Sequence, residues 1–191
     1  MAITRLGGAN AISGTIPQGN ISNASLGAVT ALPFSTGITV ADEWRLTANL
    51  DTADSVITSN LERVDTSGQG FIGSAMTESS GIFTFPSTGI YLVQFNSAFF
   101  LNGDSRYVNI SIEGTVNNSS YNTLALNTGF VQQTNSGNTS NNAHAFTLVD
   151  VTDVSNVKVR FRCGSAYASL QFGSNTDYNR TYMTFLRLGD T

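Results

Sequence analysis

The sequence predicts an all-β protein, a jelly-roll β sandwich of two antiparallel sheets with an extended N-terminal arm. Three observations lead to this prediction. Short runs alternate between apolar and polar residues, turn residues recur between the runs, and helical periodicity is almost absent. The chain has 191 residues and is 40% hydrophobic, so it can bury the core of one sandwich and still carry an appendage.

Two alternating runs predict strands with one buried side. Apolar residues occupy every second position near 106–112 and 157–163, and successive side chains of a strand point to opposite faces. The apolar positions are Val108, Ile110 and Ile112 in the first run, and Val157, Val159, Phe161 and Cys163 in the second. Cys163 is the single cysteine, so we expect a buried structural thiol and no disulfide within the chain.

Two further runs, 89–100 and 181–188, are apolar on both faces. In a sandwich one face of a strand meets the core, so the other face must be covered by something else. Another copy of the chain is the simplest cover, because closed symmetric assemblies hide such faces. The residues predicted to form this contact in a homotrimer are Tyr91, Val93, Phe95, Tyr182 and Phe185.

Residues 1–36 differ from the rest of the chain, and residues 37–191 are assigned to the jelly roll. The segment is small and polar, and its apolar residues are too sparse for a core. It predicts an extended arm that inserts isolated side chains into a partner, although a disordered tail is the usual alternative for a terminus. The side chains expected to dock are Ile3, Leu6, Ile12, Ile16, Ile21 and Leu26.

The composition disfavours several classes of protein. Charged residues make up only 12% of the chain, and the formal net charge is −4, which argues against binding of nucleic acid. No run approaches the roughly 18 apolar residues of a membrane span, and the first residues lack the apolar stretch of a signal peptide. Uncharged polar surfaces cost little to desolvate, which suits permanent packing between subunits. We expect a protein made in the cytoplasm, with no membrane partner.

The sequence offers little catalytic chemistry. His144 is the only histidine, and we expect it to face solvent or an interface. The carboxylate pairs Asp42/Glu43, Asp51/Asp54 and Asp150/Asp153 lie in turn-like sequence and are expected to be solvated. Calcium binding at Asp150 and Asp153 is the weaker alternative. We expect no catalytic residues, no cofactor and no enzymatic activity.

Two further features have more than one interpretation. Lys158, Arg160 and Arg162 form a basic stripe on one strand face. This stripe is expected to be solvated; pairing with an acidic neighbouring subunit, or binding of nucleic acid or an anionic glycan, are the alternatives. Trp44 is expected to be a packed aromatic residue, with a platform for sugar stacking as its alternative.

One motif carries a family resemblance. The run from Gly81 to Tyr91, with Phe83, Pro86 and Gly89 between them, resembles the G-x-F-x-x-P-x-x-G-x-Y signature of the complement globular-head and tumour-necrosis-factor-like jelly rolls. The physical interpretation agrees, because Pro86 and Gly89 favour a turn between two strands with aromatic residues. The resemblance spans about residues 40–190. It implies a jelly roll of ten strands that forms a homotrimer about a threefold axis.

Other segments extend the resemblance. Thr181 to Asp190 looks like the aromatic final strand of that family, and Leu148 to Val154 like its hydrophobic-acidic turn between late strands. The segment before residue 37 is similar in composition to the Gly/Asn/Ile-rich N-termini of virion proteins of tailed phages. This likeness moves the expected setting to a virus particle.

Two functions follow as expectations. The first is a structural virion protein, a trimeric capsid decoration protein that docks through its arm on the major capsid protein or another virion protein. The alternative is a tail or fibre-tip module that binds a glycan or protein on the host surface through its loops. The loop residues proposed for that contact are Asn117, Asn118, Tyr121, Asn135 and Asn138.

Overall fold

The computed structural model describes residues 37–191, and Gly37–Thr191 form one compact unit. The predicted arm, residues 1–36, lies outside the described residues. The same holds for the side chains expected to dock on a partner, Ile3, Leu6, Ile12, Ile16, Ile21 and Leu26.

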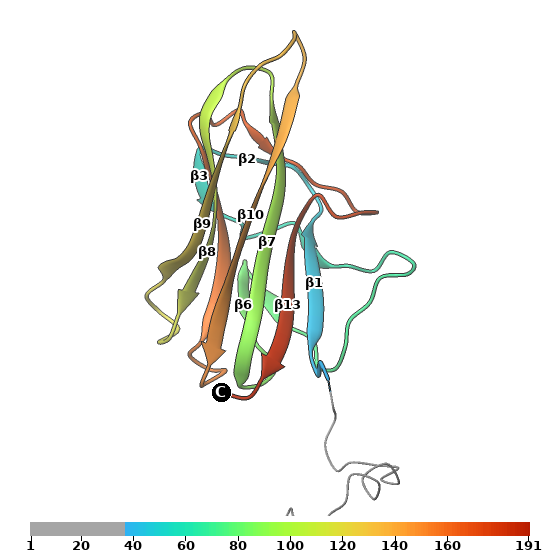
Figure 1. Cartoon of the computed structure of the whole chain (residues 1–191), viewed down its shortest axis with the longest axis vertical. Helices are drawn as coiled ribbons and strands as arrows, with labels where there is room; N and C mark the ends of the chain where they lie inside the picture. Colours follow the sequence, from blue (N-terminus) through green and yellow to red (C-terminus); the bar gives the residue numbers. More distant parts are fainter. Residues whose placement is uncertain (1–36) are drawn as a thin grey trace, which may run out of the picture. The chain divides into compact units, whose positions relative to one another are not determined.

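The described residues form thirteen strands in two antiparallel sheets (Figure 1). Sheet A contains β1 (Ala41–Leu46), β2 (Leu50–Asp51), β4 (Leu61–Arg63), β7 (Gly89–Leu101), β10 (Thr139–Val151), β12 (Gln171–Phe172) and β13 (Thr181–Gly189). Sheet B contains β3 (Asp54–Val56), β5 (Thr77–Ser79), β6 (Ile82–Thr84), β8 (Ser105–Thr115), β9 (Asn122–Val131) and β11 (Lys158–Ser165). Three short segments, β2, β3 and β12, raise the number above the ten strands expected. The predicted all-β sandwich is confirmed, and within residues 37–191 no helix is long and apolar enough to cross a membrane.

The strand order brings the edge strands of the two sheets together on one side of the sandwich. Sheet A runs β10–β7–β13–β1–β4, and sheet B runs β5–β6–β11–β8–β9. The edge strands β10 and β9 therefore lie side by side, although they belong to different sheets (Figure 1). Asparagine side chains join them: Asn127 donates to the carbonyl of His144 at 2.6 Å, and Asn141 donates to that of Phe130 at 2.8 Å.

The core between the sheets corrects part of the predicted trimer contact. Every second residue of β7 is buried, from Gly89 to Leu101, and these side chains face sheet B. Phe185 packs among Phe83, Phe85 and Phe161, with ring centroids 5.2 to 6.4 Å apart. Four predicted contact residues are fully buried in this core and cannot touch another subunit: Tyr91, Val93, Phe95 and Phe185. The prediction was wrong for these four because a strand with two apolar faces does not reveal which face is inside.

The motif from Gly81 to Tyr91 forms the expected strand–turn–strand unit, β6 to β7. Gly81 lies in the turn before β6; it has φ of +83°, and a Cβ there would lie 2.0 Å from the carbonyl oxygen of Ile57, so only glycine fits. In the turn between β6 and β7, the Tyr91 hydroxyl donates to the carbonyl of Ser87 at 3.1 Å. This bond therefore stabilises the turn that leads into β7, at the centre of sheet A.

Candidate functional site

The outer face of sheet A is the first candidate contact surface. Three rows of side chains cross β10, β7 and β13 in register. They are Leu148–Leu92–Leu186, Phe146–Gln94–Thr184 and His144–Asn96–Tyr182. Phe146 and Leu148 are 62% and 61% exposed, which is unusual for large apolar residues on a sheet. We call these nine residues the sheet A face.

Tyr182 is the one predicted trimer-contact residue that lies on this face. It is half-buried, and burial, reinforced by the nearby Glu43 carboxylate, raises the pKa of its hydroxyl. Glu43 is itself held by Asn179 and by the Thr184 hydroxyl. Of the five residues predicted for the trimer contact, Tyr182 is therefore the one whose side chain remains available for such a contact.

A loop covers the other part of sheet A. Arg45 points out from β1 beside Tyr182, yet its side chain is fully buried. It donates to Glu62 and Asp65, each at 2.7 Å, and to Thr66 at 2.9 Å. The segment from Glu62 to Thr66 thus closes over β1, and the open part of the outer face lies over β13, β7 and β10.

The edge formed by β9 and β10 continues the apolar surface. Six of the twelve exposed large apolar residues in the described part lie on or next to these two strands. They are Val116, Leu124, Leu126, Phe130, Phe146 and Leu148. A slot of about 260 Å³ opens between the two sheets beside Leu124 and Leu148. We call these six residues the β9–β10 edge, and it shares Phe146 and Leu148 with the sheet A face.

The β9–β10 edge was missed in the sequence, although a signal for it exists. Residues 143–149 place Ala143, Ala145 and Val149 on the core side and Phe146 and Leu148 on the other. That is the same pattern of two apolar faces that singled out residues 89–100. The intervening His144 and Thr147 obscure it, because they make the run look amphipathic.

The loops proposed for receptor contact do not form one site. Strand β9 separates Asn117, Asn118 and Tyr121 at one end of the sandwich from Asn135 and Asn138 at the other (Figure 1). Ten strand residues span about 33 Å. The Asn117 side chain moreover accepts hydrogen bonds from the Ser119 and Ser120 amides, so it organises its own turn. The two loops are therefore too far apart to form one compact site.

The two arginines of the basic stripe pair with carboxylates of the same chain instead of being free. Glu113, on the neighbouring strand β8, accepts hydrogen bonds from Arg160 at 2.6 Å and from Arg162 at 2.7 Å. Arg162 also pairs with Asp54 at 3.0 Å, and the bond to Glu113 raises the pKa of Arg162. Lys158 donates to the Thr84 hydroxyl at 2.8 Å. The expectation of a solvated stripe was wrong because the pairing of β8 with β11 was not known.

Tyr121 is part of the same network and not a free loop residue. The guanidinium of Arg160 lies 4.0 Å from the centre of its ring. Its hydroxyl oxygen is buried without a hydrogen-bond partner in residues 37–191, and this burial raises the pKa of the hydroxyl. Tyr121 therefore covers the ion pairs of sheet B.

The carboxylate pairs occupy different surroundings. Asp42 is buried on β1, where it binds Arg63 at 3.0 Å and the Met76 amide at 2.8 Å, so the expected solvated turn was wrong there. Asp153 accepts hydrogen bonds from the Ser155 amide and the Asn156 side chain, and the Ser155 bond lowers its pKa most. No third carboxylate, histidine or cysteine joins Asp150 and Asp153 among the described residues.

The remaining singled-out residues lie as follows. Cys163 is fully buried, as predicted, and burial raises its pKa. Trp44 packs edge-on against Phe83 at 5.5 Å, as expected for a packed aromatic residue. His144 is exposed on the outer face of sheet A and stacks beside Phe146 at 5.6 Å.

Comparisons with known proteins bear on the fold. No protein-family model and no curated protein matches the sequence. Solved structures do match. A structure of Eiger TNF from S. frugiperda has a TM-score of 0.58 at 12% identity, over 81% of this chain and 96% of that one. The chain has a TNF-like jelly-roll fold. A crystal structure of murine APRIL at pH 5.0 gives a TM-score of 0.54 at 11% identity, over 78% of this chain and 99% of that one. At such identities the TNF-like likeness extends to the fold alone.

Proposed function

We propose that this TNF-like jelly roll is the subunit of a homotrimeric structural protein. The observation that carries the proposal is the exposure of Phe146 and Leu148, at 62% and 61%, where the sheet A face meets the β9–β10 edge. The β9–β10 edge and the sheet A face point in different directions, so two copies cannot bury both through one symmetric contact of like surfaces. In the proposed trimer the β9–β10 edge of one copy therefore packs against the sheet A face of the next, and such head-to-tail contacts close into a ring. Three copies are the number that the family resemblance implies.

The energetics favour a contact that uses both surfaces. Fully burying a large apolar side chain is worth about 1.5–3 kcal/mol, and these side chains are already partly buried. The β9–β10 edge thus contributes about 5–10 kcal/mol, within the range estimated for the cost of association. Hydrogen bonds from Gln94, Asn96 and Tyr182 add to the free energy of association. A contact surface with both apolar and polar residues suits a permanent assembly.

The mass of the protein in solution tests the proposal. Light scattering on the unmutated chain should give about 61 kDa, which is three times 20.3 kDa. Leu148→Asp should shift the mass toward 20.3 kDa, because a charge would be buried in the contact. Tyr167→Asp is the matched control, since Tyr167 is 53% exposed in the loop after β11, away from the edge. A stable monomer of the unmutated chain at micromolar concentration would contradict the proposal.

For the setting we propose a virus particle, with the trimer decorating a capsid through residues 1–36. Strand β1 begins beside the end of β13, whereas the β9–β10 loop lies at the opposite end of the sandwich (Figure 1). A subunit attached through its N-terminal segment would therefore present the β9–β10 loop at its free end. Removal of residues 1–36 should leave a folded trimer that no longer joins particles. Normal incorporation of the truncated chain would overturn this part. No catalytic step belongs to the proposal.

The second candidate is a receptor-binding module at a tail or fibre tip. The polar loop from Gln132 to Asn138, at the end away from β1, favours it. Copy number separates the two candidates, because decoration requires copies over the whole shell and a tip requires a few at one vertex. Densitometry of purified particles measures it.

A further inference from the structure

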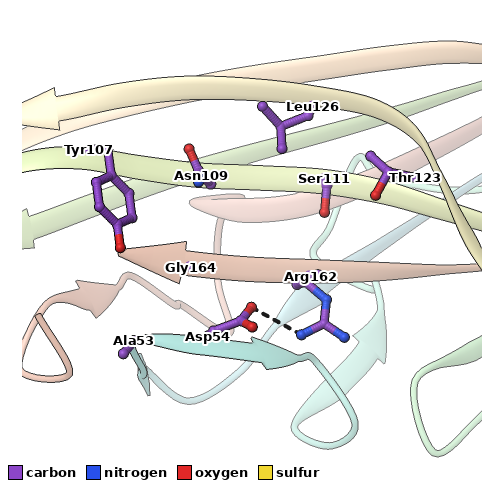
Figure 2. Close-up of a pocket in the computed structure, with 9 residues that line it drawn as sticks. All are labelled: Ala53, Asp54, Tyr107, Asn109, Ser111, Thr123, Leu126, Arg162 and Gly164. Atoms are coloured by element: carbon purple, nitrogen blue, oxygen red, sulfur yellow. Dashed lines mark hydrogen bonds and ion pairs between the residues drawn. The ribbon is translucent and has the colours of Figure 1, made fainter. Parts of the chain in front are cut away.

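Sheet B has a polar groove on the face that points away from the core (Figure 2). Its volume is about 320 Å³, at the lower end of the range for ligand sites. Side chains from β3, β8, β9 and β11 converge on it. The lining residues are Ala53, Asp54, Tyr107, Asn109, Ser111, Thr123, Leu126, Arg162 and Gly164.

The groove contains polar groups that have no hydrogen-bond partner within residues 37–191. The ordered network of Arg162 uses only one oxygen of Asp54 and leaves Nη2 of the guanidinium unbonded. Asn109 accepts a hydrogen bond from the Thr128 hydroxyl at 2.8 Å through Oδ1, so its amide nitrogen is left to donate elsewhere. The hydroxyls of Tyr107, Ser111 and Thr123 are also unbonded within the described part.

These groups are held in place before any ligand arrives. Glu113, 7% exposed, fixes Arg162 from one side at 2.7 Å, and Asp54 fixes it from the other at 3.0 Å. The Thr128 bond sets the orientation of the Asn109 amide. Because the side chains are ordered by the protein itself, binding loses little further side-chain entropy.

The charges of the site cancel. Arg160 and Arg162 pair with Glu113 and Asp54, so the groove attracts neither anions nor cations strongly. The planar side-chain groups of Asp54, Asn109 and Arg162 lie in the same groove as the Tyr107 ring and the exposed Leu126 side chain. A ligand that matches them has many hydroxyl groups, no net charge and apolar ring faces.

We propose that this groove binds a neutral saccharide, with one or two sugar rings in contact with the protein. Sugar hydroxyls donate to Asp54 and accept from Asn109 and Arg162, and a ring face lies against Tyr107. The site lies on sheet B and uses no residue of the sheet A face. It shares Leu126 with the β9–β10 edge, but every polar group that it uses lies outside both surfaces of the proposed trimer contact.

An array of neutral hexose and N-acetylhexosamine oligosaccharides, probed with the full chain, is the first experiment. The strongest binder is then titrated as the free saccharide and followed by amide chemical shifts, which should move at Asn109 and Thr123. Asn109→Ala should weaken binding about tenfold, because one hydrogen bond is lost. Thr123→Trp should abolish it by filling the groove, without removing a hydrogen bond between described residues.

The control is Asn156→Ala, the same substitution in the exposed turn between β10 and β11. It should leave the affinity unchanged. Absence of binding on the array, binding that is retained in both groove variants, or binding lost with Asn156→Ala would each overturn the proposal. The mass of every variant is measured by light scattering. A saccharide-binding monomer would refute the trimer alone, and a trimer without binding would refute the groove alone.

Discussion

Phe185 and Leu186 are neighbours on β13 with opposite surroundings, and the pair tests which side of sheet A is the core. Phe185 is fully buried and packs edge-on against Phe161 at 6.0 Å, whereas Leu186 lies on the sheet A face. Phe185→Ala should lower the free energy of unfolding by about 3–5 kcal/mol, through lost burial and a cavity. In a domain of this size that is a fall of roughly 6–20 °C in the midpoint temperature.

Leu186→Ala should act differently, because in the proposed trimer Leu186 contacts another copy. Its effect on the midpoint should be largest at concentrations where the trimer forms and should disappear on dilution to the monomer, whereas the effect of Phe185→Ala should be the same at all concentrations. Thermal unfolding by circular dichroism across a wide range of concentrations measures both. If Phe185→Ala changed only the mass in solution and left the unfolding of the subunit unaltered, the assignment of the core would be refuted.

Three further predictions concern single residues. The pKa of the Tyr121 hydroxyl is raised in the folded state, so its contribution to stability is complete below about pH 10 and is lost as pH rises through the folded-state pKa. Tyr121→Phe should therefore reduce the loss of stability in alkali, which urea titrations at several pH values measure. Gly81→Ala should destabilise the domain by more than about 2 kcal/mol, since φ is +83° and the new Cβ would meet the carbonyl of Ile57. Soluble yield and the midpoint temperature measure this loss. Glu113→Ala should lower the free energy of unfolding in urea by about 2–3 kcal/mol, because two partly exposed arginines lose their shared partner. An unchanged midpoint would show that the network contributes nothing.

The sequence carries enough information for the fold class. The alternation around Val108 and Val159 is local, and the turn at Gly81 to Tyr91 is encoded by glycine and proline at fixed spacing. Such features need no knowledge of distant partners. The structure places both alternating runs in paired strands, β8 and β11, with their apolar sides in one core.

The candidate sites were harder to predict because they depend on strand pairing. The position of Glu113 between Arg160 and Arg162 exists only when β8 lies beside β11, and these strands are far apart in the chain. Likewise, no local pattern distinguishes Phe185 from Leu186 as the inward residue. The groove on sheet B draws residues from four strands, so its polar groups look like scattered surface residues in the sequence.

The ion pairs within the chain bear on the proposed assembly. Arg45, Arg63, Arg160, Arg162 and Arg187 each pair with an acidic residue of the same chain. The rows that make up the sheet A face contain no aspartate, glutamate, lysine or arginine. Removing an unpaired charge from water costs several kcal/mol, whereas an amide or hydroxyl that finds a new partner costs little. The chain has few charges, and most of its arginines pair within it. The sheet A face is therefore a surface that another subunit can cover without leaving an ion buried.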